Sequence, residues 1–215
     1  MRISHKHKFV YIAMEKTGSV SMRNRLNQYS DIRYGNFDEK NPHTTASEVK
    51  KELFVNDTKK FNSYFKFSFV RNPWDRIVSW YEFMCKQVHK TESQKYDFTA
   101  EQYNKYKEFS LIGFNTFIRS EYKKRNSCYL GYTRYYEDKN QNNLLDFIGK
   151  CENLQQDFNI VCDKIGIPRQ QLPHNNKSKH KHYAEYYDEE TREIVAQKYA
   201  RDIEYFGYEF GEQIK

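Results

Sequence analysis

Long apolar runs are absent from this sequence of 215 residues. The N-terminus has a basic start, but the first apolar run, Phe9 to Ala13, contains only five residues. A signal peptide or membrane anchor needs a longer run, and a spanning helix needs about 18 to 20 apolar residues in succession. We therefore expect a cytoplasmic protein with no membrane span.

Cysteine is also scarce, and no two cysteines have the C-x-x-C spacing. The four are Cys85, Cys128, Cys151 and Cys162. Short paired spacings are typical of zinc sites and redox motifs, and no other metal-ligand spacing is present. No metal is therefore predicted, and we interpret the four cysteines as the reduced thiols of a cytosolic chain.

Aromatic residues and positive charge are abundant instead. Phe, Tyr and Trp make up 17% of the chain, so much of the core must be aromatic. Lys and Arg number 36 against 29 Asp and Glu, a formal net charge of +7. That balance suits polyanions such as nucleotides, acidic glycans or nucleic acid. The length and the lack of repeats or linkers indicate one domain, residues 1–215.

The most informative stretch is a strand, turn and helix near the N-terminus. Residues 9–13 are typical of a buried strand, and a polar turn follows over residues 15–19. Val20, Met22 and Leu26 then recur at helical spacing. A strand that turns sharply into a helix directs free backbone N–H groups at one point, where the helix dipole also favours an anion.

The residue types in this turn suit a phosphate. Gly18 lets the backbone approach closely, Ser19 and Ser21 add hydroxyl donors, and Lys16 adds a positive charge. The motif G-x-x-x-x-G-K-[ST] is absent from the chain, so this is not the loop of a P-loop nucleoside triphosphatase.

A second unit of the same kind follows. Residues 65–70 alternate and favour a central strand, which leads into Arg71. Asn72 is a good N-cap and Pro73 a good first helical residue. The apolar stripe expected on this helix consists of Trp74, Ile77, Val78, Tyr81, Met84 and Cys85. Two such units predict an α/β fold with a parallel sheet flanked by helices, and ligands at the carboxyl ends of the strands.

The rest of the chain predicts mainly helices. Residues 45–48 form a capping-box pattern that begins a helix, and residues 86–125 are predicted as an insertion with one or two helices. Leu144, Leu145, Ile148 and Cys151 have helical spacing, so we expect a helix there.

Two further helices have clear ends in the sequence. A second helix from Leu154 should end at Gly166, and a last helix should begin at Asp188 and end at Gly207. Between them lies a basic loop over residues 174–182.

Several of these segments resemble one family, the sulfotransferases that use 3′-phosphoadenosine 5′-phosphosulfate (PAPS). Residues 15–21 resemble their 5′-phosphosulfate loop, and residues 71–76 with Ser79 resemble their 3′-phosphate element. Residues 147–158 and 201–210 resemble the carbohydrate branch of the family. The two phosphate motifs occur in the family's order, each after an expected strand.

The resemblance implies a P-loop-like sulfotransferase domain that moves a sulfuryl group from PAPS to an acceptor hydroxyl, on a carbohydrate, leaving adenosine 3′,5′-bisphosphate. Lys16 would contact the 5′-phosphate and the bridging oxygen, and Arg71 would contact the 3′-phosphate. The residues assigned to the nucleotide are Lys16, Thr17, Gly18, Ser19, Val20, Ser21, Arg71 and Ser79. One position departs from the family's pattern, since Glu15 stands where a proline is usual. A carboxylate there must point away from the anion or pair with a neighbouring base.

His43 is the predicted general base, and Lys16 and His43 are the predicted catalytic residues. The place of His43, just before a helix that precedes the Arg71 strand, matches that of the catalytic histidine in some glycan O-sulfotransferases. The positive end of the following helix would also disfavour the imidazolium and keep the ring ready to accept a proton.

Two other classes stay open at this point. A P-loop-like ATP-dependent kinase is disfavoured because its nucleotide motif and a magnesium-binding Asp after a strand are missing. A non-catalytic module that binds polyanions would explain the net charge but not the paired phosphate loops. We therefore expect no nucleic-acid partner.

Overall fold

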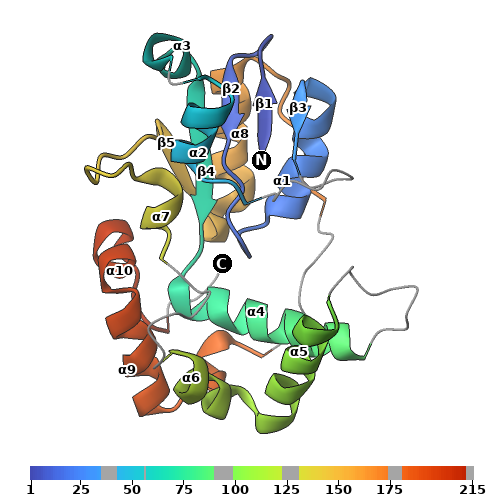
Figure 1. Ribbon diagram of the computed structural model, residues 1–215, viewed down its shortest axis with the longest axis vertical. Helices are drawn as coiled ribbons and strands as arrows, with labels where there is room; N and C mark the ends of the chain where they lie inside the picture. Colours follow the sequence, from blue (N-terminus) through green and yellow to red (C-terminus); the bar gives the residue numbers. More distant parts are fainter. Residues whose placement is uncertain (35–42, 56, 90–98, 123–130, 174–180, 212–215) are drawn as a thin grey trace. The chain divides into compact units, whose positions relative to one another are not determined.

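The computed structural model (Figure 1) describes residues 1–34, 43–55, 57–89, 99–122, 131–173 and 181–211. The chain divides into two compact units, each built from two separate segments. The first unit is Met1–Arg71 with Tyr132–Lys177, and the second is Asn72–Gly131 with Ser178–Lys215. A single domain over residues 1–215 stays a prediction.

The first unit contains a five-stranded mixed sheet of order β3-β1-β2-β4-β5. Its strands are β1 (Arg2–Ser4), β2 (Phe9–Tyr11), β3 (Ile32–Arg33), β4 (Phe65–Val70) and β5 (Phe147–Lys150). The predicted α/β fold is confirmed, and β2, β4 and β5 run parallel. The sheet is not parallel throughout, because β1 pairs antiparallel with both β2 and β3. Strands β1 and β3 are too short to show a period in the sequence.

The helix predicted over Leu144 to Cys151 is wrong, because this segment contains strand β5. Gly149 lies opposite Phe69 of β4 in the parallel register. A β-carbon at Gly149 would come within 2.5 Å of the Phe69 ring, so only glycine fits this close approach of strand and side chain. Short apolar runs are ambiguous between helix and strand, and here the pairing with β4 decides the outcome.

The described helices of the first unit lie around the sheet (Figure 1). They are α1 (Ser19–Leu26), α2 (Ala46–Glu52), α3 (Thr58–Asn62), α7 (Thr133–Tyr136) and α8 (Leu154–Ile165). Met22 of α1 and Phe158 of α8 share one buried cluster with Tyr11 and Phe67 of the sheet. As predicted, α8 ends at Gly166, which has a φ of 68° in the left-handed region.

The second unit is helical in its described part. Its helices are α4 (Pro73–Val88), α5 (Ala100–Ile112), α6 (Phe114–Tyr122), α9 (Glu189–Lys198) and α10 (Ala200–Phe206). The predicted α4 is confirmed, and its apolar stripe lies in a buried cluster with residues of α6 and α9. The two helices α5 and α6 confirm the helices expected within residues 86–125. The predicted last helix begins at the Asp188 cap and ends at Gly207, but it is interrupted at Tyr199.

Some sequence predictions fall outside the described residues. Residues 35–42 of the irregular segment before His43, and residues 174–180 of the basic loop, belong to this group. Among the helices that are described, none combines the length and the apolar character needed to cross a bilayer.

Candidate functional site

The predicted phosphate loop joins β2 to α1. After β2 the chain stays extended and buried, and the Ile12 N–H donates to the Phe67 carbonyl at 2.9 Å. It then turns sharply through two residues in the left-handed region, Lys16 at φ 63° and Gly18 at φ 73°. Helix α1 starts directly after them at Ser19.

The N-terminus of α1 has the properties of an anion site. Gly18 is its N-cap, so no side chain caps the first turn, and no acidic residue lies in that turn. By helix geometry the N–H groups of Ser19, Val20 and Ser21 have no intrahelical acceptor. A β-carbon at Gly18 would come within 2.7 Å of a terminal methyl group of Leu154, which would have to shift, and the positive φ also favours glycine.

Lys16 holds a backbone conformation that costs a side-chain-bearing residue about 1–3 kcal/mol. Glycine would adopt the same φ without that cost. Strain of this kind is typical of functional positions, where a particular side chain is needed.

Two hydroxyls of the loop already donate to carbonyl groups. Thr17 Oγ1 donates to the Met14 carbonyl at 3.0 Å, and Ser21 Oγ donates to the Pro173 carbonyl at 2.7 Å. The hydroxyl of Ser21, predicted as a phosphate donor, therefore fixes α1 to the segment that follows α8. The loop offers an anion its backbone N–H groups, the Ser19 hydroxyl and Lys16.

Arg71 lies at the carboxyl end of β4, beside the loop that follows β2. Its Nη1 approaches the Lys16 carbonyl at 3.4 Å, so the two predicted motifs meet within the first unit. They meet because β2 and β4 are adjacent and parallel, which brings their carboxyl ends together.

A residue that the sequence analysis missed holds the Arg71 backbone. The fully buried Tyr132 hydroxyl accepts a hydrogen bond from the Arg71 N–H and donates one to the Arg71 carbonyl, both at 3.0 Å. No sequence pattern marks Tyr132, because its role depends on a contact across 61 residues.

Removal of this hydroxyl should have a measurable cost. Tyr132→Phe removes both hydrogen bonds to the partly buried backbone of Arg71, so we expect the free energy of unfolding to fall by about 1–3 kcal/mol in urea. Tyr11→Phe is the matched control, because the buried Tyr11 hydroxyl has no hydrogen-bond partner within the described residues. It should lose little stability, and equal losses in both variants would contradict this role of Tyr132.

His43 lies against the same loop. Its Nδ1 is 2.8 Å from the Ala13 carbonyl. A carbonyl only accepts, so Nδ1 carries the proton and Nε2 carries the lone pair. Burial lowers the pKa of His43, against the opposing effects of the Ala13 hydrogen bond and the Glu15 carboxylate. The expected neutral imidazole is therefore supported, but burial causes it rather than the helix end proposed from the sequence.

Ser79 belongs to the second unit, on α4, and only 9% of it is exposed. It is thus not a surface serine, and its contact with a 3′-phosphate stays a prediction. The N-terminus of α4 is closed by the Asn72 side chain, which accepts a hydrogen bond from the Trp74 N–H. Binding of an anion near α4 would therefore depend on side chains rather than on the helix end.

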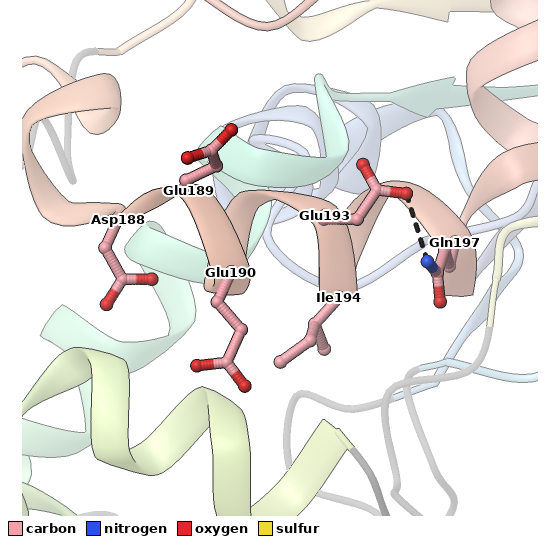
Figure 2. A pocket seen from close by; sticks show the side chains of 6 residues that line it. All are labelled: Asp188, Glu189, Glu190, Glu193, Ile194 and Gln197. Carbon is pink, nitrogen blue, oxygen red and sulfur yellow. Dashed lines mark hydrogen bonds between the residues drawn. The ribbon is translucent and has the colours of Figure 1, made fainter.

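A depression on the surface of α9 (Figure 2) contains none of the predicted site residues. It is lined by Asp188, Glu189, Glu190, Glu193, Ile194 and Gln197. Its acidic groups have the wrong charge for a nucleotide, and two of them are already paired, because Arg119 bridges Asp188 and Glu190. Over the described ranges, no group of three or more His, Cys, Asp or Glu is arranged to hold a metal ion.

Comparison with known proteins identifies the protein family to which the chain belongs. The model of the sulfotransferase family matches residues 1–209, so the chain belongs to that family. It is also 33% identical over 115 residues to an uncharacterized protein of Archaeoglobus fulgidus, a match that covers 52% of this chain and 76% of that protein. No solved structure matches.

Proposed function

We propose that this protein transfers a sulfuryl group from PAPS to a hydroxyl of a carbohydrate acceptor, by in-line displacement. The observation that carries the proposal is the meeting of Lys16 and Arg71 at the carboxyl ends of adjacent parallel strands. Membership of the sulfotransferase family supports the reaction class. We place the reaction in the cytoplasm, where cysteines such as Cys85, Cys151 and Cys162 remain thiols.

The residues present fit the nucleotide. The uncapped first turn of α1 suits the 5′-phosphate, with the N–H groups of residues 17–21 as donors. Arg71 suits the 3′-phosphate, because a guanidinium offers several donors in one plane. The resemblance of residues 71–79 to the family's 3′-phosphate element assigns Ser79 to the same phosphate as a second donor. When bound, PAPS would supply the activated sulfuryl group.

Two residues would carry the chemistry. Lys16 would neutralise the charge that develops on the oxygen between phosphorus and sulfur as the bond from that oxygen to sulfur breaks. His43 accepts the proton of the attacking hydroxyl at Nε2, since Nδ1 is committed to the Ala13 carbonyl. A carbohydrate acceptor is supported by the likeness of residues 147–158 and 201–210 to that branch and by the net charge of +7.

Metal-free titration calorimetry tests the proposal. We expect adenosine 3′,5′-bisphosphate to bind more tightly than ADP or 5′-AMP, because it alone fills both phosphate positions. Arg71→Ala should lose roughly 10- to 100-fold in affinity for the bisphosphate and little for 5′-AMP. Arg169→Ala is the control, since Arg169 only pairs with Asp163 on the surface of the same unit.

Other outcomes would overturn the proposal. Equal or absent binding of the three nucleotides would contradict the assignment of both phosphate positions. Competition by ATP that appears only with Mg²⁺ would indicate a kinase. Binding of polyanions that falls steeply with salt, without modification of any acceptor, would indicate a binding module.

A further inference from the structure

Arg23 is a basic residue of α1 that is not among the residues assigned to PAPS. Its side chain turns back toward the helix N-terminus, and Nε donates to the carbonyl of Ser19, the first helical residue, at 3.3 Å. Nη1 of the same guanidinium is buried and meets no hydrogen-bond partner in the described part of the chain. Within the described residues, a cationic donor without an acceptor thus belongs to a side chain that is anchored on the first residue of α1.

Two other arginines of the same unit, Arg2 and Arg25, differ from Arg23 in their burial and their hydrogen bonds. The fully buried Arg2 donates to Asn27 Oδ1 and to the carbonyls of Met1 and Tyr34. Arg25 lies two residues further along α1, where its Nε donates to the Gln171 carbonyl at 2.9 Å at an exposed position. The buried guanidinium of Arg2 therefore has acceptors at both Nε and Nη1, whereas in the described part of the chain Arg23 has an acceptor at Nε and none at Nη1.

The positive charge of Arg23 extends to groups around the loop. It lowers the pKa of His43, although burial is the larger cause. It also lowers the pKa of Tyr11 on β2, against the dominant effect of burial, which raises it. The other charges that act on His43 are the Glu15 carboxylate, which raises its pKa, and the N-terminal amino group, which lowers it.

Stability does not explain a guanidinium in this position. Arg23 as a whole is half-buried, but a buried donor atom without an acceptor is unfavourable, and replacement by an apolar side chain of similar volume is often neutral or stabilising. An anion at the first turn of α1 would supply the missing acceptor, because charge-assisted hydrogen bonds to phosphate oxygens suit a guanidinium.

We infer that Arg23 is a further anion-binding residue of the phosphate loop, whose Nη1 binds an oxygen of the 5′-phosphosulfate group. This inference rests on the proposed function. It assigns the 5′ position a second basic side chain besides Lys16, and it adds that this side chain lies close enough to influence His43.

Ligand truncation separates this role from a structural one. Arg23→Met should weaken binding of adenosine 3′,5′-bisphosphate by about 10- to 100-fold in metal-free calorimetry. Its affinity for adenosine 3′-phosphate, which lacks the 5′ group, should not change. The unliganded variant should be at least as stable in urea as the wild type, and its His43 should show a higher pKa by NMR. Arg25→Met is the matched control and should bind both nucleotides as the wild type does.

Three other results would contradict the inference about Arg23. Equal losses for the two nucleotides, or unchanged binding of the bisphosphate, would overturn the role of Arg23 while the proposed function stands. A wild-type protein that binds neither nucleotide would overturn both.

Discussion

Lys16→Ala is expected to slow sulfuryl transfer by at least about 100-fold, with a smaller loss of affinity for the bisphosphate. Removal of a single donor that stabilises developing charge costs about 10²–10³ in rate in well-studied enzymes. The ground-state phosphate keeps the N–H groups of the α1 turn, so binding depends less on Lys16. Single-turnover transfer from labelled PAPS, together with calorimetry of the bisphosphate, measures the two effects separately.

Lys16→Gly is the sharper companion variant. Glycine adopts a φ of 63° without backbone strain, so this variant should be at least as stable as the wild type in urea. It should nevertheless lose transfer as fully as the alanine variant. Lys16→Arg, which keeps the charge, should retain part of the rate. Full activity of Lys16→Gly would show that the side chain has no role in the reaction.

His43→Ala is expected to reduce turnover by about 10²–10⁴-fold, the range typical of a lost general base. The bisphosphate should bind nearly as in the wild type, because no nucleotide contact is assigned to His43. His43→Asn adds a control for anchoring, since its amide can still donate to the Ala13 carbonyl but cannot act as a base. His7→Ala should keep full activity, although the His7 ring also bonds to a backbone carbonyl, that of Ile165.

The pH dependence of kcat/KM should reflect the titration of His43. The pKa of His43 lies below the ordinary value of about 6.5, so the neutral base persists and activity is kept as the pH falls to that value. The acid limb of the profile should therefore begin below about pH 6.5 and should be missing in His43→Asn. A limb at or above the ordinary histidine pKa would contradict the assignment.

Stability should change over the same range of pH. In the unfolded chain His43 takes up a proton near pH 6.5, whereas the folded protein resists it. The contribution of His43 is therefore complete above about pH 6.5 and is lost as the pH falls from there through the folded pKa. Urea unfolding of the wild type should weaken more steeply over this window than that of His43→Asn.

Local features of the site could be predicted from the sequence alone. The pattern of a strand, a glycine turn and a helix predicted the loop around Gly18. An N-cap residue followed by proline predicted the start of α4. The capping box at Thr45 fixed the helix after His43. Each of these depends on neighbours within a few residues, and their chemistry is therefore visible as a pattern.

The sheet itself needed the tertiary structure. Strand β5 has apolar spacing that also fits a helix, and only its register with β4 decides the matter. Strands β1 and β3 contain too few residues for any period to appear.

The sequence thus determined the motifs of this protein, including Lys16, Arg71 and the histidine that precedes α2. Only the tertiary structure decided which of them meet. It brought Arg71 to the Lys16 loop, seated His43 on Ala13 and placed Tyr132 on the Arg71 backbone. It also left Arg23 Nη1 buried without an acceptor among the described residues. The physical reason is that burial and hydrogen bonds between distant segments depend on strand order and packing, which no local pattern encodes.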